Sequence, residues 1–160
     1  MNRKLVLTIS VATLCVACDR APVEQGTPRI PWNEFRDRFI ESYFQYFPRA
    51  AVNAGRHEYD GQIRDISPGA IEVVVDWLSA QRAEALEYSG GDLSGDASFE
   101  RDYLVAAVDD MLFTLDISGF FESNPVMYTR AIDPTVYLTR EYAPLSTRMA
   151  AFTSHAEHIP

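Results

Sequence analysis

The residues best suited to chemistry gather in one short polar stretch of the chain. His57 is followed by Glu58, Asp60 and Asp65, and Gly61 interrupts the stretch. Imidazole changes its charge near neutral pH, and carboxylates beside it can act as acids, bases or metal ligands. The polar composition predicts a loop, and loops carry many functional side chains. The sequence therefore indicates a candidate site around His57 but assigns no reaction to it.

The other two histidines of the chain lie near the end of the sequence. His155 and His158 are three residues apart, with Glu157 between them. On a helix such residues share a face, but a zinc site needs three or four ligands, and the metalloprotease helix spaces its histidines four apart. We interpret the pair as polar residues that stabilise a helix C-terminus through its dipole. No zinc site and no other cofactor is predicted in this chain.

The chain is acidic, and this bears on its partners. Its 160 residues include 23 Asp and Glu against 14 Lys and Arg, for a net charge of −9. Such a chain repels phosphate backbones, so we expect no nucleic-acid binding. One predicted helix carries several carboxylates, and a solvated face is a simpler interpretation for them than a buried acid–base pair. These residues are Asp102, Asp109, Asp110 and Asp116.

The elements that must position these residues are helices. With 47% hydrophobic and 23% charged residues, the composition fits one globular domain. The apolar spacing predicts an all-α fold of about five or six antiparallel helices. Ser67-Pro68 predicts a helix start, and Gly55 is expected to end the helix before the polar loop. The predicted helices cover about residues 33–47, 48–54, 68–89, 96–117, 133–142 and 144–159.

Two of these helices allow a prediction of the buried face. Between residues 99 and 115 the apolar side chains cover so wide an arc that partners are expected on more than one side. Phe99 and Tyr103 are expected to face inward there, with Leu104 and Val108 to the side. In the last helix the side chains expected to face inward are Leu145, Met149 and Phe152.

The N-terminus predicts export and a lipid anchor. Two basic residues precede the apolar run Leu5–Val16, which is shorter than the roughly 20 residues that cross a bilayer but matches a signal peptide. The run ends in Val16-Ala17-Cys18, which resembles the bacterial lipobox, whose cysteine is lipidated. An ordinary secretory signal cut after Ala17 and an uncleaved anchor are the alternatives.

These segments divide the chain into three parts. Residues 1–17 are predicted to be a lipoprotein signal peptide, and residues 18–32 the lipidated Cys18 with a tether rich in proline and polar residues. Residues 33–160 then form the helical domain. We expect the protein at the bacterial cell envelope, facing the periplasm and held at the membrane by its lipid.

Three blocks of sequence resemble one bacterial family. The motif Phe47-Pro48 to Gly55 leads into His57-Glu58-Tyr59-Asp60 and then Asp65-Ile66-Ser67. The other blocks are Phe99–Phe113 with Asn124–Tyr128, and Arg140–Pro144 with Arg148. In this order, over about residues 33–160, they resemble the N-terminal signature of the domain of unknown function 885 family, which is zincin-like and metallopeptidase-related. The resemblance marks His57, Tyr59, Asp60 and Asp65 as signature residues of unknown role.

The catalytic motif of that family is not in this sequence. Its His-Glu-x-x-Pro-Gly-His helix does not occur among the 160 residues. The resemblance therefore implies the N-terminal helical part of a larger zincin-like fold, an incomplete domain with zinc expected only in a full-length relative. No catalytic residue is carried over to this chain.

Two hypotheses of function follow. In the first, the chain is the front part of an exported zinc-hydrolase-like lipoprotein of unknown substrate and is inactive alone. In the second, it is a small lipid-anchored helical protein that binds a protein partner. The partners expected are the membrane, through the anchor, and either the missing C-terminal part or a second copy of the chain.

Lipidation can be tested directly. We expect mass spectrometry of the membrane-extracted protein to find Cys18 as the first residue, carrying acyl chains, because one chain alone would anchor only marginally. A soluble protein whose free N-terminus is any other residue would contradict this prediction.

Overall fold

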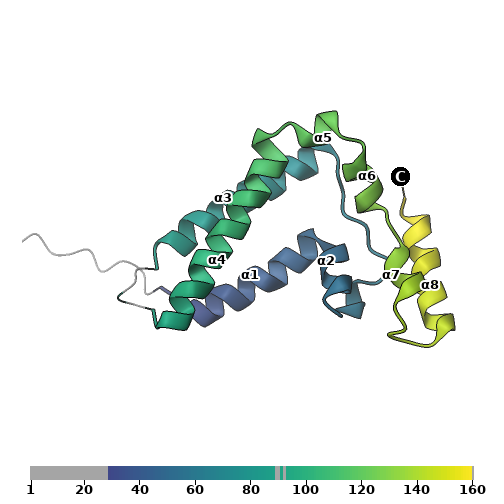
Figure 1. Cartoon of the computed structure of the whole chain (residues 1–160), viewed down its shortest axis with the longest axis horizontal. Helices are drawn as coiled ribbons and strands as arrows, with labels where there is room; N and C mark the ends of the chain where they lie inside the picture. The colour runs from purple at the N-terminus through teal and green to yellow at the C-terminus, as the bar shows by residue number, and fades with distance from the viewer. Residues whose placement is uncertain (1–28, 89–90, 92, 160) are drawn as a thin grey trace, which may run out of the picture.

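The computed structural model describes residues 29–88, 91 and 93–159. The predicted signal peptide, Cys18 and most of the tether lie outside the described residues. Over the described part the chain is all-α, as predicted, with no β-strand (Figure 1). No described helix is long and apolar enough to span a membrane.

Three long helices form the larger half of the molecule. They are α1 (Trp32–Tyr46), α3 (Pro68–Leu86) and α4 (Gly95–Leu112). Ser67 begins α3 as predicted, since its Oγ accepts a hydrogen bond from the backbone N–H of Ala70, and Ser94 caps α4 in the same way. The short connection between them makes α3 and α4 antiparallel neighbours, and α1 lies across from the pair (Figure 1).

Aromatic side chains join α1 to α3 and α4. The ring of Trp77 packs on Phe39 at 5.3 Å and on Tyr46 at 4.8 Å between centroids. The Trp32 indole donates a hydrogen bond of 2.9 Å to Glu100 on α4. The side chains buried most completely in this core are Phe35, Leu78 and Val108. Burial of such large apolar side chains is the main favourable contribution to the stability of a core.

A second, smaller cluster holds the other half of the chain. It joins α2 (Pro48–Asn53) and the short 3₁₀ helix η1 (His57–Tyr59) to α7 (Thr135–Thr139) and α8 (Leu145–Glu157). Its buried residues are Val52, Tyr137 and Ala151. Figure 1 shows α7 and α8 side by side at the C-terminal end, close to α2. The loop after η1 therefore runs from this cluster to the start of α3.

The connection between the two halves is more helical than the sequence predicted. The π-helical turn η2 (Phe113–Ile117) follows α4, and Gly119 at φ 61° then reverses the chain. Two short helices come next, α5 (Phe120–Ser123) and α6 (Val126–Ala131). The sequence predicted only a turn at Asn124-Pro125, because helices this short leave little apolar periodicity to read.

Helix starts were predicted to within a residue or two. The first helix, predicted to begin at residue 33, begins one residue earlier, at Trp32. Gly55 has φ 89°, the left-handed conformation expected for the residue that ends α2. The predicted helix 133–142 is shorter: α7 begins after Pro134, and Asp133 lies just before it and accepts a hydrogen bond from the Thr135 N–H.

The predicted inward faces of α4 and α8 are wrong in part. Phe99 and Tyr103 are 71% and 69% exposed, whereas Leu104 and Val108 are buried. A helix that is apolar around most of its circumference can rotate into the core in more than one way, and contact with α1 and α3 selects the Leu104 side. In α8, Leu145 is 62% exposed, and the buried residues are Arg148, Ala151 and His155.

The burial of α4 gives a stability prediction. We expect Leu104→Ala to lower the free energy of unfolding by about 2–5 kcal/mol, since it empties a buried site. Phe99→Ala, on the exposed side of the same helix, should change it by no more than about 0.5 kcal/mol. Urea unfolding of both variants tests the assignment, and the reverse order of effects would show that Phe99 faces the core.

Candidate functional site

The imidazole of His57 lies against the chain segment between α7 and α8. Its ring stacks on Tyr142 with centroids 3.6 Å apart and planes 9° from parallel. Its Nδ1 is 3.2 Å from one oxygen of Asp60. The other oxygen of Asp60 accepts a hydrogen bond of 2.8 Å from the Tyr142 hydroxyl. The three side chains therefore form one cluster in which Asp60 is the shared acceptor.

The chemistry of this cluster is that of a hydrogen-bonded clasp. A carboxylate can only accept hydrogen bonds, so the proton between His57 and Asp60 is carried by Nδ1 of the imidazole. One oxygen of Asp60 faces His57, and the other joins the loop to Tyr142, which lies 82 positions further along the chain. Burial, and then the hydrogen bond to Asp60, raises the pKa of the Tyr142 phenol above its ordinary value.

The next residue, Gly61, makes a second attachment to the same helices. Its backbone N–H donates a hydrogen bond of 2.8 Å to the hydroxyl of Tyr137 on α7. Its φ is +80°, and a Cβ placed there would lie 2.5 Å from the Oγ of Ser154 on α8. Glycine is therefore required at this position both by the left-handed backbone and by the close approach of α8.

The four signature residues do not form one site. His57 and Asp60 are together, but Tyr59 contacts α1, with its ring 6.3 Å from that of Phe44. Asp65 acts locally at the start of α3, where its Oδ1 accepts a hydrogen bond of 2.8 Å from the Ser67 N–H. That hydrogen bond lowers the pKa of the Asp65 carboxyl. The structure thus divides the signature into a clasp, an aromatic contact and a helix start.

The residues that complete the clasp could not be found by reading the sequence. Tyr142 and Tyr137 lie about 80 positions from the loop, and neither belongs to a motif with a known role in such a contact. The one available signal was the short motif around Tyr142 that resembles the family, Arg140–Pro144. That motif pointed to the segment but not to its partner.

The two C-terminal histidines behave differently from each other. His158 is exposed, and its Nδ1 lies 2.7 Å from the carbonyl of Ser154. His155 is only 3% exposed, and its Nε2 lies 2.9 Å from the carbonyl of Ile132. His155 does lie in the last turn of α8, but its side chain is buried, because α8 turns that face toward Tyr137 on α7. Among the described residues, no group of three or more His, Cys, Asp and Glu side chains is placed to hold a metal ion.

The predicted acidic face of α4 is exposed. Asp109 forms an ion pair with Arg82 on α3, and Asp102 pairs with its neighbour Arg101. The carboxylates in question all lie in solvent-exposed positions, which agrees with a solvated face: Asp102, Asp109, Asp110 and Asp116.

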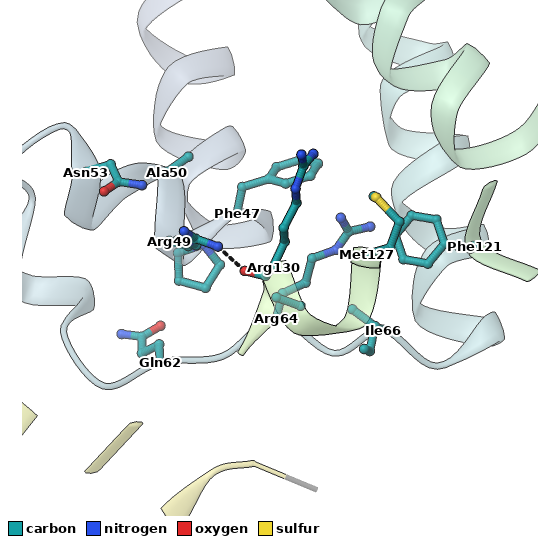
Figure 2. Close-up of a pocket in the computed structure, with 12 residues that line it drawn as sticks. Phe47, Arg49, Ala50, Asn53, Gln62, Arg64, Ile66, Phe121, Met127 and Arg130 are labelled. Carbon is teal, nitrogen blue, oxygen red and sulfur yellow. Dashed lines mark hydrogen bonds between the residues drawn. The ribbon is translucent and has the colours of Figure 1, made fainter. Parts of the chain in front are cut away.

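A cavity of about 280 Å³ is lined in part by the same loop, through Gln62, Arg64 and Ile66. Figure 2 shows Arg64 entering it from the loop, Arg49 from α2 and Arg130 from α6. Arg49 donates a hydrogen bond to the backbone carbonyl of Arg130 and forms an ion pair with Asp133 at 2.6 Å. The apolar part of the wall comes mainly from Phe47, Ile66, Phe121 and Met127.

A wider groove of about 550 Å³ lies between α1 and α4. Phe99 and Tyr103 form one edge, with their rings stacked at 6.4 Å, and Ile40 lies on the α1 side. Among the described residues that line the groove, the one basic side chain is Arg36, which is paired with Asp37 and Glu100. The groove is therefore apolar with a negative border.

Comparisons with known proteins give no relative: no family model, no curated protein and no solved structure matches the chain. The resemblance noted from the signature residues therefore stays a prediction.

The clasp predicts a specific pH dependence. Because the folded-state pKa of Tyr142 is raised, its contribution to stability is complete below its ordinary pKa of about 10 and is lost as the pH rises through the folded-state value. Tyr142→Phe removes one hydrogen bond and should lower stability by about 1 kcal/mol at pH 7. The variant should also lose stability less steeply than the parent between about pH 10 and 12.

The matched control is Tyr103→Phe, which removes the hydroxyl of an exposed tyrosine. Denaturant titrations at pH 7, 10, 11 and 12 measure both effects. Equal alkaline slopes for the parent and Tyr142→Phe would show that the hydroxyl does not hold the loop.

Proposed function

We propose that this chain is the lipid-anchored, periplasm-facing helical portion of a zinc-hydrolase-like envelope protein, and that its own role is to dock further helices without catalysing a reaction. The observation that carries the docking role is the α1/α4 groove with its exposed Phe99 and Tyr103, whereas the anchor and the zinc-hydrolase-like parent rest on the sequence resemblances. Exposed apolar patches of this kind are typical of surfaces that bind protein.

The shape of the groove supports a helix as the docked element. It runs between two long helices and is lined by side chains from successive turns of both, such as Phe39 and Tyr43 on α1 and Phe99 and Tyr103 on α4. An amphipathic helix presents apolar residues at three- and four-residue spacing and fits such a groove. Because the apolar side chains of α4 cover a wide arc, we also expect this side of the helix to pack against a partner.

The charge of the groove supports a basic partner over a second copy of the chain. Arg36 is already paired, which leaves an excess of carboxylate on the border, including Asp110. The whole chain has a net charge of −9, so two copies repel each other. The docked helix is therefore expected to carry lysine or arginine beside its apolar face.

The alternative is that the chain is a small lipoprotein that docks a separate protein through the same groove. The gene distinguishes the two. Coding sequence beyond codon 160 that contains a His-Glu-x-x-Pro-Gly-His segment supports the zinc-hydrolase-like protein, and its absence supports the separate partner.

Docking itself can be tested with a designed probe. We expect a synthetic amphipathic helix with leucines on one face and flanking lysines to bind the soluble domain, and Phe99→Ser with Tyr103→Ser to weaken that binding at least about fivefold. Fluorescence anisotropy of the labelled peptide measures the affinity. Both residues are exposed, so the folded domain should remain intact by circular dichroism.

Two controls separate docking from general charge attraction. Phe113→Ser changes an exposed phenylalanine that does not line the groove, and it should leave the affinity unchanged. A scrambled peptide of the same charge should bind weakly. Equal binding of the scrambled peptide, or equal loss in Phe113→Ser, would refute docking at the groove.

A further inference from the structure

Arg64 is the charged side chain that the contacts above leave least explained. Its Nε and Nη2 atoms are buried and have no hydrogen-bond partner among the residues that the structure describes. Its guanidinium faces the rings of Phe47 at 4.6 Å and Phe121 at 5.8 Å. A buried cation without an anionic partner is costly, and buried polar groups are nearly always hydrogen-bonded. We therefore expect a hydrogen-bond acceptor to bind at Nε and Nη2 of Arg64.

The two atoms without partners define the geometry of that acceptor. The Nε–H and Nη2–H bonds lie on the same edge of the planar guanidinium and are nearly parallel. They can therefore donate to both oxygens of one carboxylate at once. A single water or carbonyl oxygen can bridge both N–H groups only with bent hydrogen bonds, whereas a carboxylate offers one oxygen to each. The pattern of unpaired donors thus favours a carboxylate over a neutral ligand.

The surroundings of Arg64 add positive charge and no negative charge. Arg49 and Arg130 line the same cavity, while no Asp or Glu among the described residues lines it (Figure 2). Arg49 is paired with Asp133, which lies outside the lining. Among the described residues, Arg64 and Arg130 form no ion pair, so their two guanidinium groups give the cavity a positive potential that attracts an anion.

The remaining wall of the cavity is apolar, so the part of the ligand outside its carboxylate is expected to be apolar as well. Phe47, Phe121 and Met127 offer aromatic and flexible apolar surface around the cavity. Its volume of about 280 Å³ exceeds the roughly 150 Å³ that accommodates benzene in an apolar protein cavity. A one-ring molecule with a carboxylate substituent therefore fits the available space.

We propose that this cavity binds a small organic carboxylate, with the carboxylate on Nε and Nη2 of Arg64 and the apolar body against the part of the wall formed by Ile66 and Met127. Both donors are buried, so the ligand reaches them when a side chain of the wall moves. Met127 and Arg130 are long, flexible side chains in that wall. Free acids and the C-terminal carboxylate of a peptide share this chemistry, and the site is separate from the α1/α4 groove.

The first test uses benzoate as the probe and benzamide as its neutral isostere. We expect benzoate to raise the thermal midpoint of the domain in a saturable way, as a ligand that binds only the folded state must. Benzamide should have little effect. Equal stabilisation by both compounds, or none by benzoate, would overturn the proposal.

The second test replaces the guanidinium of Arg64 with an apolar side chain of similar length. Arg64→Met should weaken benzoate binding, measured by calorimetry, about tenfold or more. Arg82→Gln, which alters an arginine outside the cavity, should bind as the parent does. Full binding by Arg64→Met, or loss in Arg82→Gln, contradicts the assignment. If Arg64→Met does not fold, Arg130→Met on the exposed side of the cavity should still weaken binding about threefold.

The third test distinguishes the two sources of carboxylate. A dipeptide ending in phenylalanine with a free carboxylate is compared with the same peptide amidated. Tighter binding of the free peptide than of benzoate indicates a peptide terminus as the ligand, whereas binding of benzoate alone indicates a free acid. Binding by neither carboxylate would refute the site.

Discussion

The arrangement of this protein depends on how two tyrosine hydroxyls hold the loop after η1. Tyr142 donates to Asp60, and Tyr137 accepts from the Gly61 N–H. These contacts join the loop to the last helices, together with a small apolar cluster and the hydrogen bond from Arg140 to the Asn53 carbonyl. The two contacts are made by neighbouring residues, Asp60 and Gly61, and Gly61 has no room for a side chain. Together they fix the loop in place against α7 and α8. That position also directs Arg64 into its cavity.

Buried polar side chains explain why short helices can pack at the C-terminal end. Short helices leave many backbone carbonyls without intrahelical partners. Arg148 donates to the carbonyls of Tyr137 and Ala143, both at 3.0 Å. His155 lies at hydrogen-bond distance from the Ile132 carbonyl. The buried face of α8 therefore includes the polar residues Arg148 and His155, whereas Leu145, which the apolar pattern predicted to be buried, is exposed.

The two proposed surfaces are built on opposite electrostatic principles. In the α1/α4 groove the single cation is neutralised and the border is negative, whereas the Arg64 cavity gathers guanidinium groups without a lining carboxylate. In an acidic chain, a local excess of positive charge stands out against the overall field. A basic helix and a small carboxylate are thus recognised at separate places by ordinary charge complementarity.

The sequence by itself determined the all-α class, the capped start of α3 at Ser67-Pro68 and the stop at Gly55. Each of these follows from local chemistry: a hydroxyl that caps a backbone N–H, a proline suited to the first turn, and a glycine that accepts positive φ. Only the tertiary structure decided which face of α4 is buried, that His155 lies inside, and that His57 and Asp60 meet Tyr142. Those outcomes depend on contacts between separate segments, 82 positions apart for Asp60 and Tyr142 and 23 for Ile132 and His155. A wide apolar arc also permits several rotations of a helix until its neighbours select one.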